Sequence, residues 1–385
     1  MTVDRRERRI LIVAGEASGD LHAANLIRAA REMDSGFSFF GVTGERMRAA
    51  GCETLVPSET IAVMGLVEVV RHLPAIRRAF RAVKATFFGP QRPDLLVLVD
   101  FPGFNMRLAK VAKKYGIPVL YYITPKVWAW KKKRARTLAH IADRLAVIFP
   151  FEPEIFRPFG ANVEYVGNPL LDEYADYLQK RTSLRPYAVD GHRSIGLFPG
   201  SRRSEIYYNL ETMLQTAALL KEKDPSCLFL MPLASSLDRQ EIEQRIATSG
   251  VPVRLIADDI YGVAESCDAV LAVSGTVTLQ VALAGAPLAV MYKLASLSYE
   301  VAIRVVKIPY VSLVNIVAGR EVVREFIQDE ARPEVLTAEL LNLLDGDVYN
   351  KKVCDALADV RQKLGQSGCS NRVAAIVAQM TGQHG

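Results

Sequence analysis

The sequence predicts an α/β protein with two doubly wound, Rossmann-like domains that face a cleft. Three observations predict this class. Short apolar runs alternate with helical patterns along most of the chain, as expected for βαβ units around a parallel sheet. The alternation restarts after residues 168–192, a stretch rich in Pro, Gly and polar residues that has the composition of a linker. The 385 residues are also enough for two domains of this kind.

The individual elements follow from hydrophobic periodicity. In the first half we expect strands at 10–14, 37–42, 95–99, 119–123 and 145–149, and helices at 21–32, 75–84, 104–115 and 131–141. In the second half we expect strands at 195–198, 228–232, 253–256, 269–273 and 288–292, and helices at 205–223, 238–248, 277–284 and 299–306. The resulting domains span 1–172 and 173–350, and a helical tail at 351–385 is expected to pack back across them.

Composition narrows the class of protein. The five cysteines form no C-x-x-C pair and have no His cluster beside them, which argues against a disulfide framework or a zinc site and fits a reducing compartment. No apolar run approaches the roughly 18–20 residues that span a bilayer, and the apolar start is too short for a signal peptide, so we expect a cytoplasmic chain.

Charge is distributed unevenly along the chain. Residues 1–170 carry 26 Lys and Arg against 16 Asp and Glu, a net charge of +10, whereas residues 171–385 carry 22 against 26, a net charge of −4. The basic half predicts an anionic partner, either nucleic acid or lipid headgroups, and a merely solvated basic surface is the alternative.

Two strand-to-helix turns in the second half predict anion binding. Ser274-Gly-Thr276 follows one apolar strand and opens a helix, where free N–H groups and the helix dipole attract a phosphate. Pro199-Gly-Ser-Arg202 follows another strand, and its guanidinium can grip a phosphate bidentately. Together the turns predict a nucleotide ligand, with Gln280 placed to reach its ribose. Asn315, in an apolar run, is also expected at this ligand, whereas internal hydrogen bonds would explain Arg320 and Glu321.

Two carboxylates follow strands of the first half. Asp100 emerges directly after the apolar run 95–99, beside Phe101 and Phe104, and such partly desolvated carboxylates suit general base catalysis. Its alternative role is a cap for the next helix. Glu16 ends the first strand in the turn Ala14-Gly-Glu-Ala-Ser-Gly-Asp20, where Ser18 or Asp20 could cap the helix that follows.

Two segments of the first half predict lipid contact. The first is a basic amphipathic helix that is started or interrupted near Pro74. Its apolar face carries Val69, Leu73 and Phe80, and its other face carries Arg77 and Arg78. A second segment combines Trp128 and Trp130 with the cations of 131–136. In both segments the alternative is ordinary packing against a core.

Eight stretches of the chain resemble, in order, those of the lipid-A-disaccharide synthase family, inverting glycosyltransferases of the GT-B architecture. They are Ala14-Gly-Glu-Ala-Ser-Gly-Asp20, Ala62-Val-Met-Gly-Leu-Val-Glu68, Asp100-Phe-Pro-Gly-Phe-Asn105, Val127-Trp-Ala-Trp130, Phe149-Pro-Phe-Glu152, Pro199-Gly-Ser-Arg202, Ser274-Gly-Thr276 and the stretch from Tyr310-Val-Ser-Leu313 to Ala318-Gly-Arg-Glu-Val322. Gln280 stands where the family usually carries Glu.

The resemblance implies transfer of a sugar from UDP-2,3-diacylglucosamine to 2,3-diacylglucosamine 1-phosphate, giving the β(1→6) disaccharide and UDP. The implied base is Asp100, and no metal or other cofactor is implied. The implied binding residues are Glu16, Ser18 and Asn105 for the acceptor, and Arg202, Ser274, Gly275, Thr276, Gln280 and Asn315 for the donor.

The resemblance also implies a protein at the inner face of the bacterial inner membrane that binds no nucleic acid, and it allows a homodimer. The alternatives are another GT-B enzyme that uses UDP-N-acetylglucosamine and a non-catalytic lipid-binding relative.

Overall fold

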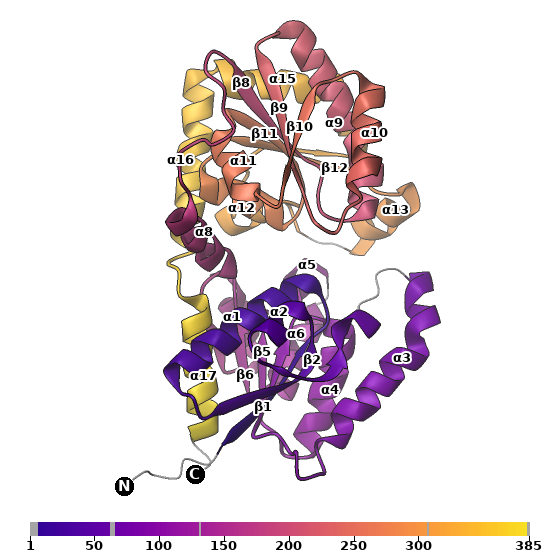
Figure 1. The fold of residues 1–385 in the computed structure, drawn as a ribbon, viewed down its shortest axis with the longest axis vertical. Helices are drawn as coiled ribbons and strands as arrows, with labels where there is room; N and C mark the ends of the chain where they lie inside the picture. Colours follow the sequence, from indigo (N-terminus) through magenta and orange to yellow (C-terminus); the bar gives the residue numbers. More distant parts are fainter. Residues whose placement is uncertain (1–6, 62–65, 131, 306–307, 383–385) are drawn as a thin grey trace. The chain divides into compact units, whose positions relative to one another are not determined.

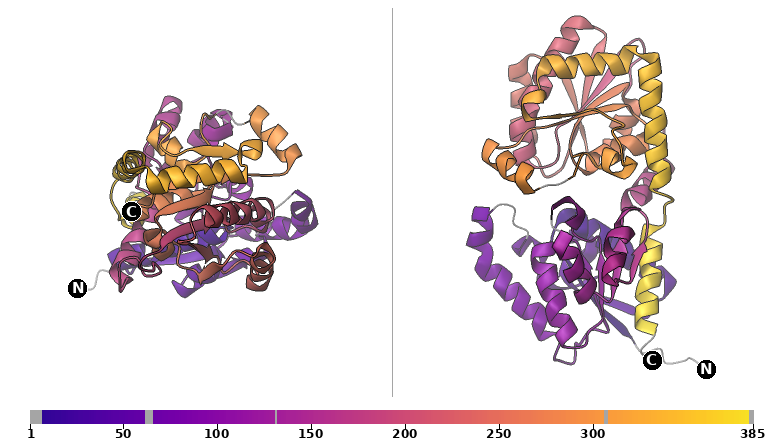
Figure 2. Two further views of the ribbon diagram at one scale, coloured as in Figure 1. Left: turned by 90° about the horizontal axis from the view of Figure 1, so that it is seen from above. Right: turned by 180° about the vertical axis from the view of Figure 1, so that it is seen from behind.

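The computed structural model describes residues 7–61, 66–130, 132–305 and 308–382. The chain divides into two compact units, one made of Met1–Pro169 with Gln366–Gly385 and the other of Leu170–Gly365. Each unit is an open parallel sheet with helices on both faces (Figures 1 and 2). The predicted class, two parallel α/β units, is therefore confirmed.

The first unit is built on a seven-stranded parallel sheet with the order β3-β2-β1-β4-β5-β6-β7. Its strands are β1 Arg8–Ala14, β2 Phe37–Thr43, β3 Glu53–Pro57, β4 Leu95–Val99, β5 Val119–Tyr122, β6 Arg144–Val147 and β7 Val163–Tyr165. The strand order reverses between β1 and β4, whose last residues Ala14 and Val99 are paired. In folds of this kind, ligands bind beyond the carboxyl ends of the strands at such a reversal.

Alternate side chains of β1 enter two separate cores. Ile10, Ile12 and Ala14 face the core under α1 (Ala17–Met33) and α17 (Cys369–Gly382). Leu11 and Val13 face the opposite core. That second core is covered by α3 (Leu66–Ala85), α4 (Pro102–Lys114) and α6 (Lys132–Ile141). Burial on both faces explains why the strands read as continuous apolar runs. The short helices α2 Glu45–Ala49, α5 Val127–Trp130 and α7 Glu152–Phe156 complete this unit.

The second unit has a six-stranded parallel sheet with the order β10-β9-β8-β11-β12-β13, which reverses between β8 and β11. Its strands are β8 Arg193–Phe198, β9 Cys227–Leu233, β10 Val253–Ala257, β11 Ala269–Val273, β12 Leu288–Tyr292 and β13 Glu325–Ile327. Its helices are α8 Pro169–Lys180, α9 Arg203–Lys223, α10 Arg239–Ser249, α11 Ile260–Ser266, α12 Thr276–Ala284, α13 Ser296–Val305, α14 Leu313–Ala318, α15 Pro333–Asp345 and α16 Asp347–Lys363.

Two expectations about these elements need correction. The strands β3, β7 and β13 were not predicted, because they are short and mostly exposed or half-buried edge strands without an apolar run. Pro74 neither starts nor breaks α3, which runs through it from Leu66 to Ala85. The predicted helical tail 351–385 is shared between the units, since residues up to Gly365 belong to the second unit and Gln366–Gly385 belong to the first.

Candidate functional site

Three adjacent strands of the first unit end side by side, and the predicted carboxylates follow two of them. Ala14 of β1 pairs with Val99 of β4, and Val99 pairs with Tyr122 of β5. The residues that follow these strands, including Glu16 and Asp100, therefore lie at one edge of the sheet, where its strand order reverses. The predicted acid–base and acceptor residues Asp100 and Glu16 are brought to the same edge.

Asp100 is held in a rare backbone conformation. Its φ is 45° and that of Phe101 is 48°, so two consecutive residues other than glycine are left-handed. The Asp100 N–H donates to the Tyr122 carbonyl at 3.1 Å, which extends the sheet pairing by one residue. The Asp100 carbonyl accepts hydrogen bonds from the Tyr121 hydroxyl and from Asn105 Nδ2, each at 2.8 Å. Contacts to the backbone of Asp100 thus fix the direction in which its half-buried side chain leaves the strand.

The alternative role of Asp100 as a helix cap is not what the structure shows. The residue at the N-cap of α4 is Phe101. Its ring stacks on Phe104, with the ring centroids 5.7 Å apart, and covers the backbone of Gly15. A Cβ added at Gly15 would lie 2.5 Å from the Phe101 ring, so this turn requires glycine for close approach.

The turn after β1 differs from the capping prediction. Ser18 and Asp20 lie inside the first turn of α1 and do not cap it; the N-cap residue is Glu16, whose side chain makes no capping hydrogen bond. Asp20 is buried and accepts the N–H groups of Gly44, Arg46 and Met47, which fixes the start of α2. Glu16 is half-buried and Ser18 is exposed at the sheet edge.

Asn105, predicted to bind the acceptor, lies inside the fold. Its side chain is completely buried, and Nδ2 donates to the carbonyls of Val13, Val99 and Asp100 at 3.4, 3.2 and 2.8 Å. These bonds tie the ends of β1 and β4 together. A buried amide used in this way supports the turn at Asp100 and is not placed to touch a substrate.

Glu152, at the start of α7 beyond the end of β6, is a buried carboxylate that the sequence analysis did not single out. It is 1 % exposed and accepts hydrogen bonds from Thr124 Oγ1, Trp128 Nε1 and the N–H groups of Ile148 and Phe149. Burial raises the pKa of Glu152 to about 7, although the four donors oppose that rise. Its appearance in the motif Phe149-Pro-Phe-Glu152 was the available signal.

The same contacts correct the lipid prediction for Trp128. This side chain is 9 % exposed, packs edge-on against Phe149 and Phe151, and donates its indole N–H to Glu152. It is a packing residue, as the alternative held. The side chains of Trp130 and Val69 lie outside the described residues.

The basic helix α3 is partly a core element. Phe80 packs against the core and meets Phe104 edge-on, with the ring centroids 5.5 Å apart, so its predicted lipid contact is not supported. Leu73 is half-buried, whereas Arg77 and Arg78 are exposed. In the described part of α3, Arg77 and Arg78 are therefore the predicted lipid-contact residues that are exposed enough to reach a headgroup.

In the second unit, the turn after β11 has the features of an anion site. Gly275 is the N-cap of α12, and a Cβ added there would meet nothing within 4 Å. Thr276 is exposed and begins the helix, whose first N–H groups have no intrahelical acceptor. The Ser274 hydroxyl donates to the Val311 carbonyl at 2.7 Å, which fixes the turn. Gln280 is half-buried and lies near the Tyr261 phenol, whose pKa is raised by burial.

The turn after β8 already holds an anion of its own. The Glu205 carboxylate accepts the N–H groups of Ser201 and Arg202 at 3.0 and 3.2 Å, and Arg202 Nη1 lies 3.0 Å from Glu205 Oε1. The predicted backbone site at Pro199-Gly-Ser-Arg202 is therefore occupied internally. The Arg202 side chain is 56 % exposed, so its guanidinium still faces solvent.

Asn315 is used inside the second unit, which corrects its placement at the ligand. It is completely buried, with Nδ2 donating to Val323 O and Glu325 Oε1 and with Oδ1 accepting the N–H groups of Val322 and Val323. Arg320 and Glu321, assigned to internal hydrogen bonds, are exposed, and Arg320 forms an ion pair with Asp359 at 3.8 Å.

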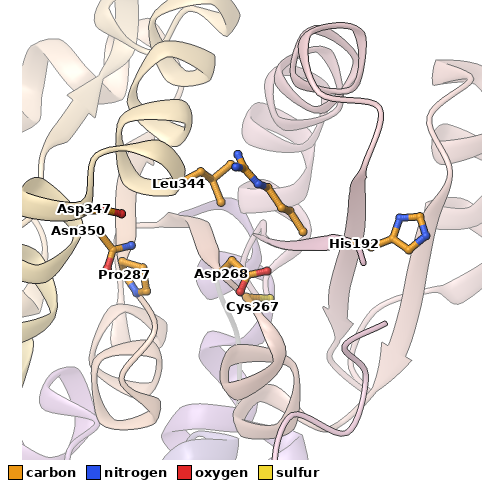
Figure 3. Close-up of a pocket in the computed structure, with 8 residues that line it drawn as sticks. His192, Cys267, Asp268, Pro287, Leu344, Asp347 and Asn350 are labelled. Atoms are coloured by element: carbon orange, nitrogen blue, oxygen red, sulfur yellow. The ribbon is translucent and has the colours of Figure 1, made fainter. Parts of the chain in front are cut away.

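A cavity of about 570 Å³ lies at the opposite end of the second sheet (Figure 3). Its lining includes Arg193 at the start of β8 and Asp268 just before β11. Asp268 is bound by the Ser194 N–H and by Arg185, and Arg193 by Asp224 and Asp345. Because the charges of Arg193 and Asp268 are paired and the cavity lies at the amino ends of the strands, this cavity does not match a ligand site of this fold.

Within the described ranges, no three or more His, Cys, Asp or Glu side chains are grouped so that they could hold a metal ion. No helix in the same ranges is both long and apolar enough to cross a bilayer.

The two parallel α/β units, each with a reversal in its strand order, define the GT-B class of fold. The putative UDP-N-acetylglucosamine 2-epimerase of Listeria monocytogenes is similar with a TM-score of 0.68 and 14% identity, covering 98% of both chains. The glycosyltransferase of kitacinnamycin is similar with a TM-score of 0.61 and 16% identity, covering 97% of this chain and 99% of that one. At these identities the likeness shows the fold alone.

Sequence comparison is more specific. The family model for lipid-A-disaccharide synthetase matches residues 10–379. The chain is 52% identical to the lipid-A-disaccharide synthase of Syntrophotalea carbinolica, over 98% of this chain and 96% of that protein. It is 46% identical to that of Geobacter sulfurreducens, over 99% of both. The chain belongs to the lipid-A-disaccharide synthase family, the hexosyltransferases of lipid A biosynthesis.

Proposed function

We propose that the chain transfers the sugar of UDP-2,3-diacylglucosamine to the 6-hydroxyl of 2,3-diacylglucosamine 1-phosphate, with inversion. The first unit would hold the acceptor and the second unit the donor. The observation that carries the proposal is the position of Asp100, a carboxylate at the reversal point of a GT-B-type sheet whose backbone is fixed from both sides.

The reaction would be a single displacement. Asp100 would accept the proton of the acceptor 6-hydroxyl while the oxygen of that hydroxyl bonds to the anomeric carbon of the donor. The bond between that carbon and the diphosphate oxygen would break, and its electron pair would leave with UDP. General base catalysis of this kind contributes roughly 10²–10⁴ in rate.

The leaving diphosphate would be bound by the N-terminus of α12 at Ser274, Gly275 and Thr276, with the half-exposed Arg202 as its cationic ligand. Gln280 would reach the ribose from the second turn of the same helix. Glu16 and Ser18 would orient the acceptor, since they lie at the edge that carries Asp100.

We further propose that the enzyme works at an anionic membrane surface. The exposed Arg77 and Arg78 of α3 support this, because cations near such a surface attract lipid headgroups. A homodimer stays a prediction, which a molar mass measured in solution would check.

The test is turnover of both acylated substrates in detergent, with and without EDTA, followed by determination of the anomeric configuration of the product. We expect a β(1→6) disaccharide, stoichiometric UDP and no effect of EDTA. Absence of product under conditions where another member of the family is active would contradict the proposal, and a requirement for added metal would contradict its metal-independent form.

A further inference from the structure

The backbone at the end of β4 is strained. Asp100 and Phe101 have φ values of 45° and 48° in succession, immediately after five fully buried strand residues. A residue other than glycine is disfavoured in this region and persists only where its surroundings impose it. Asp tolerates the region better than an aromatic residue does. Some specific contact must therefore hold this turn.

The peptide group between Asp100 and Phe101 is held by two side chains. Its carbonyl accepts the Tyr121 hydroxyl and Asn105 Nδ2, both at 2.8 Å. Asn105 comes from α4 just beyond the turn, whereas Tyr121 belongs to the neighbouring strand β5. The tyrosine therefore ties the turn to a rigid element outside its own segment.

Tyr121 is buried in the sheet core, where a phenylalanine would fill nearly the same space. Its exposed fraction is 0 %, and its partner in the sheet register is Leu98. A phenol in such surroundings must find an acceptor, and this one donates to the Asp100 carbonyl. The hydroxyl is the part of the side chain that packing alone does not explain.

We propose that Tyr121 is a positioning residue for Asp100, acting through the backbone carbonyl and not on the substrate. The φ and ψ of Asp100 set the direction of its Cα–Cβ bond and hence the place of its carboxylate. Without the hydroxyl, the strained peptide can relax toward an ordinary conformation and move the carboxylate away from the acceptor hydroxyl. This inference rests on the role of Asp100 in the proposed function.

The primary test compares Tyr121→Phe with Tyr122→Phe. Tyr122 is the adjacent residue of β5, equally buried, and its hydroxyl meets Cys369 Sγ at 3.4 Å in the opposite core. Its backbone carbonyl, which continues the sheet pairing to Asp100, is unchanged by the substitution. Both variants delete one buried hydroxyl, so urea unfolding should show comparable losses of stability.

We expect Tyr121→Phe to lower kcat roughly 10- to 100-fold with KM within about twofold, since displacement of a catalytic group by ~1 Å costs up to about 10²-fold. Tyr122→Phe should keep kcat within about twofold. Equal kcat losses in the two variants, or a wild-type kcat in Tyr121→Phe, would overturn the positioning role.

A double-mutant cycle with Asp100→Asn separates this inference from the proposed function. If Tyr121 acts through the carboxylate, Tyr121→Phe should have little further effect on the residual rate of Asp100→Asn. A full additional loss in that background would overturn the inference while leaving the base in place. Wild-type turnover by Asp100→Asn would contradict the base itself, and with it the positioning role.

Discussion

At the residue scale, Glu152 joins the end of β6 to the segment that carries Trp128. Both of its oxygens are occupied by donors, and its pKa is raised to about 7 because the group is buried. A raised pKa means that folding favours the protonated carboxyl. Its contribution to stability is complete below the unfolded pKa, near 4.5, and is lost as the pH rises through about 7.

This linkage predicts a pH-dependent difference between the wild type and Glu152→Gln. From pH 5 to 8 the wild type should lose on the order of 3 kcal/mol of unfolding free energy relative to the variant, because the amide cannot ionise. Urea unfolding of both proteins at each pH measures the difference directly, since other titrating groups are common to both. A difference that stays constant across this range would show that Glu152 ionises with an ordinary pKa.

At the scale of elements, α12 begins at the turn that we propose binds the diphosphate. Gly275 has an extended backbone that any residue can adopt, and a methyl group there would project into open space. We therefore expect Gly275→Ala to leave thermal stability unchanged but to weaken UDP binding about tenfold, because the methyl group would obstruct approach to the first N–H groups of the helix.

Calorimetric titration with UDP gives the affinity. Gly103→Ala is the matched control, since a Cβ at Gly103 also meets nothing within 4 Å but lies in α4 of the first unit. UDP affinity that is unchanged in Gly275→Ala, or reduced equally in both variants, would exclude the turn after β11 as the diphosphate site.

The elements also show what the sequence could and could not predict. Strands β4, β11 and β12 were predicted to the residue because they are apolar runs buried on both faces. The edge strands β7 and β13 have three residues each and no such pattern. A continuous apolar run marks a strand that is buried on both faces of a sheet, and an edge strand buries too few residues to show one.

Partner choice inside the fold was equally invisible in the sequence. Asp100 and Ser274 were found because they directly follow buried strands. The sequence gives no sign that Glu205 fills the turn at Arg202, or that Asn315 is used by β13 and its approach. These contacts depend on which polar group lies nearest after folding. Motif and spacing alone therefore assigned the backbone of the turn at Arg202, and Asn315, to ligands.

At the scale of the whole molecule, the basic first half is the feature that a membrane-surface role would use. We expect the double variant Arg77→Ala, Arg78→Ala to bind vesicles containing phosphatidylglycerol roughly tenfold or more weakly, at about 1 kcal/mol per arginine. Arg28→Ala removes an exposed cation from α1 of the same unit and is the control. Equal losses in control and variant would indicate a diffuse charge effect, and no vesicle binding by the wild type would contradict the membrane role.

The central claim is that Asp100 is the base for disaccharide formation, and Asp100→Asn tests it most directly. The variant should fold normally, because asparagine tolerates a left-handed φ and leaves the hydrogen bonds of the N–H and carbonyl of residue 100 unchanged. Glu154→Gln, an exposed carboxylate of the same unit, is the control. We predict a kcat lowered about 10²–10⁴-fold with the fold intact in Asp100→Asn and wild-type turnover in the control. Turnover by a folded Asp100→Asn within a few-fold of the wild type would contradict the account.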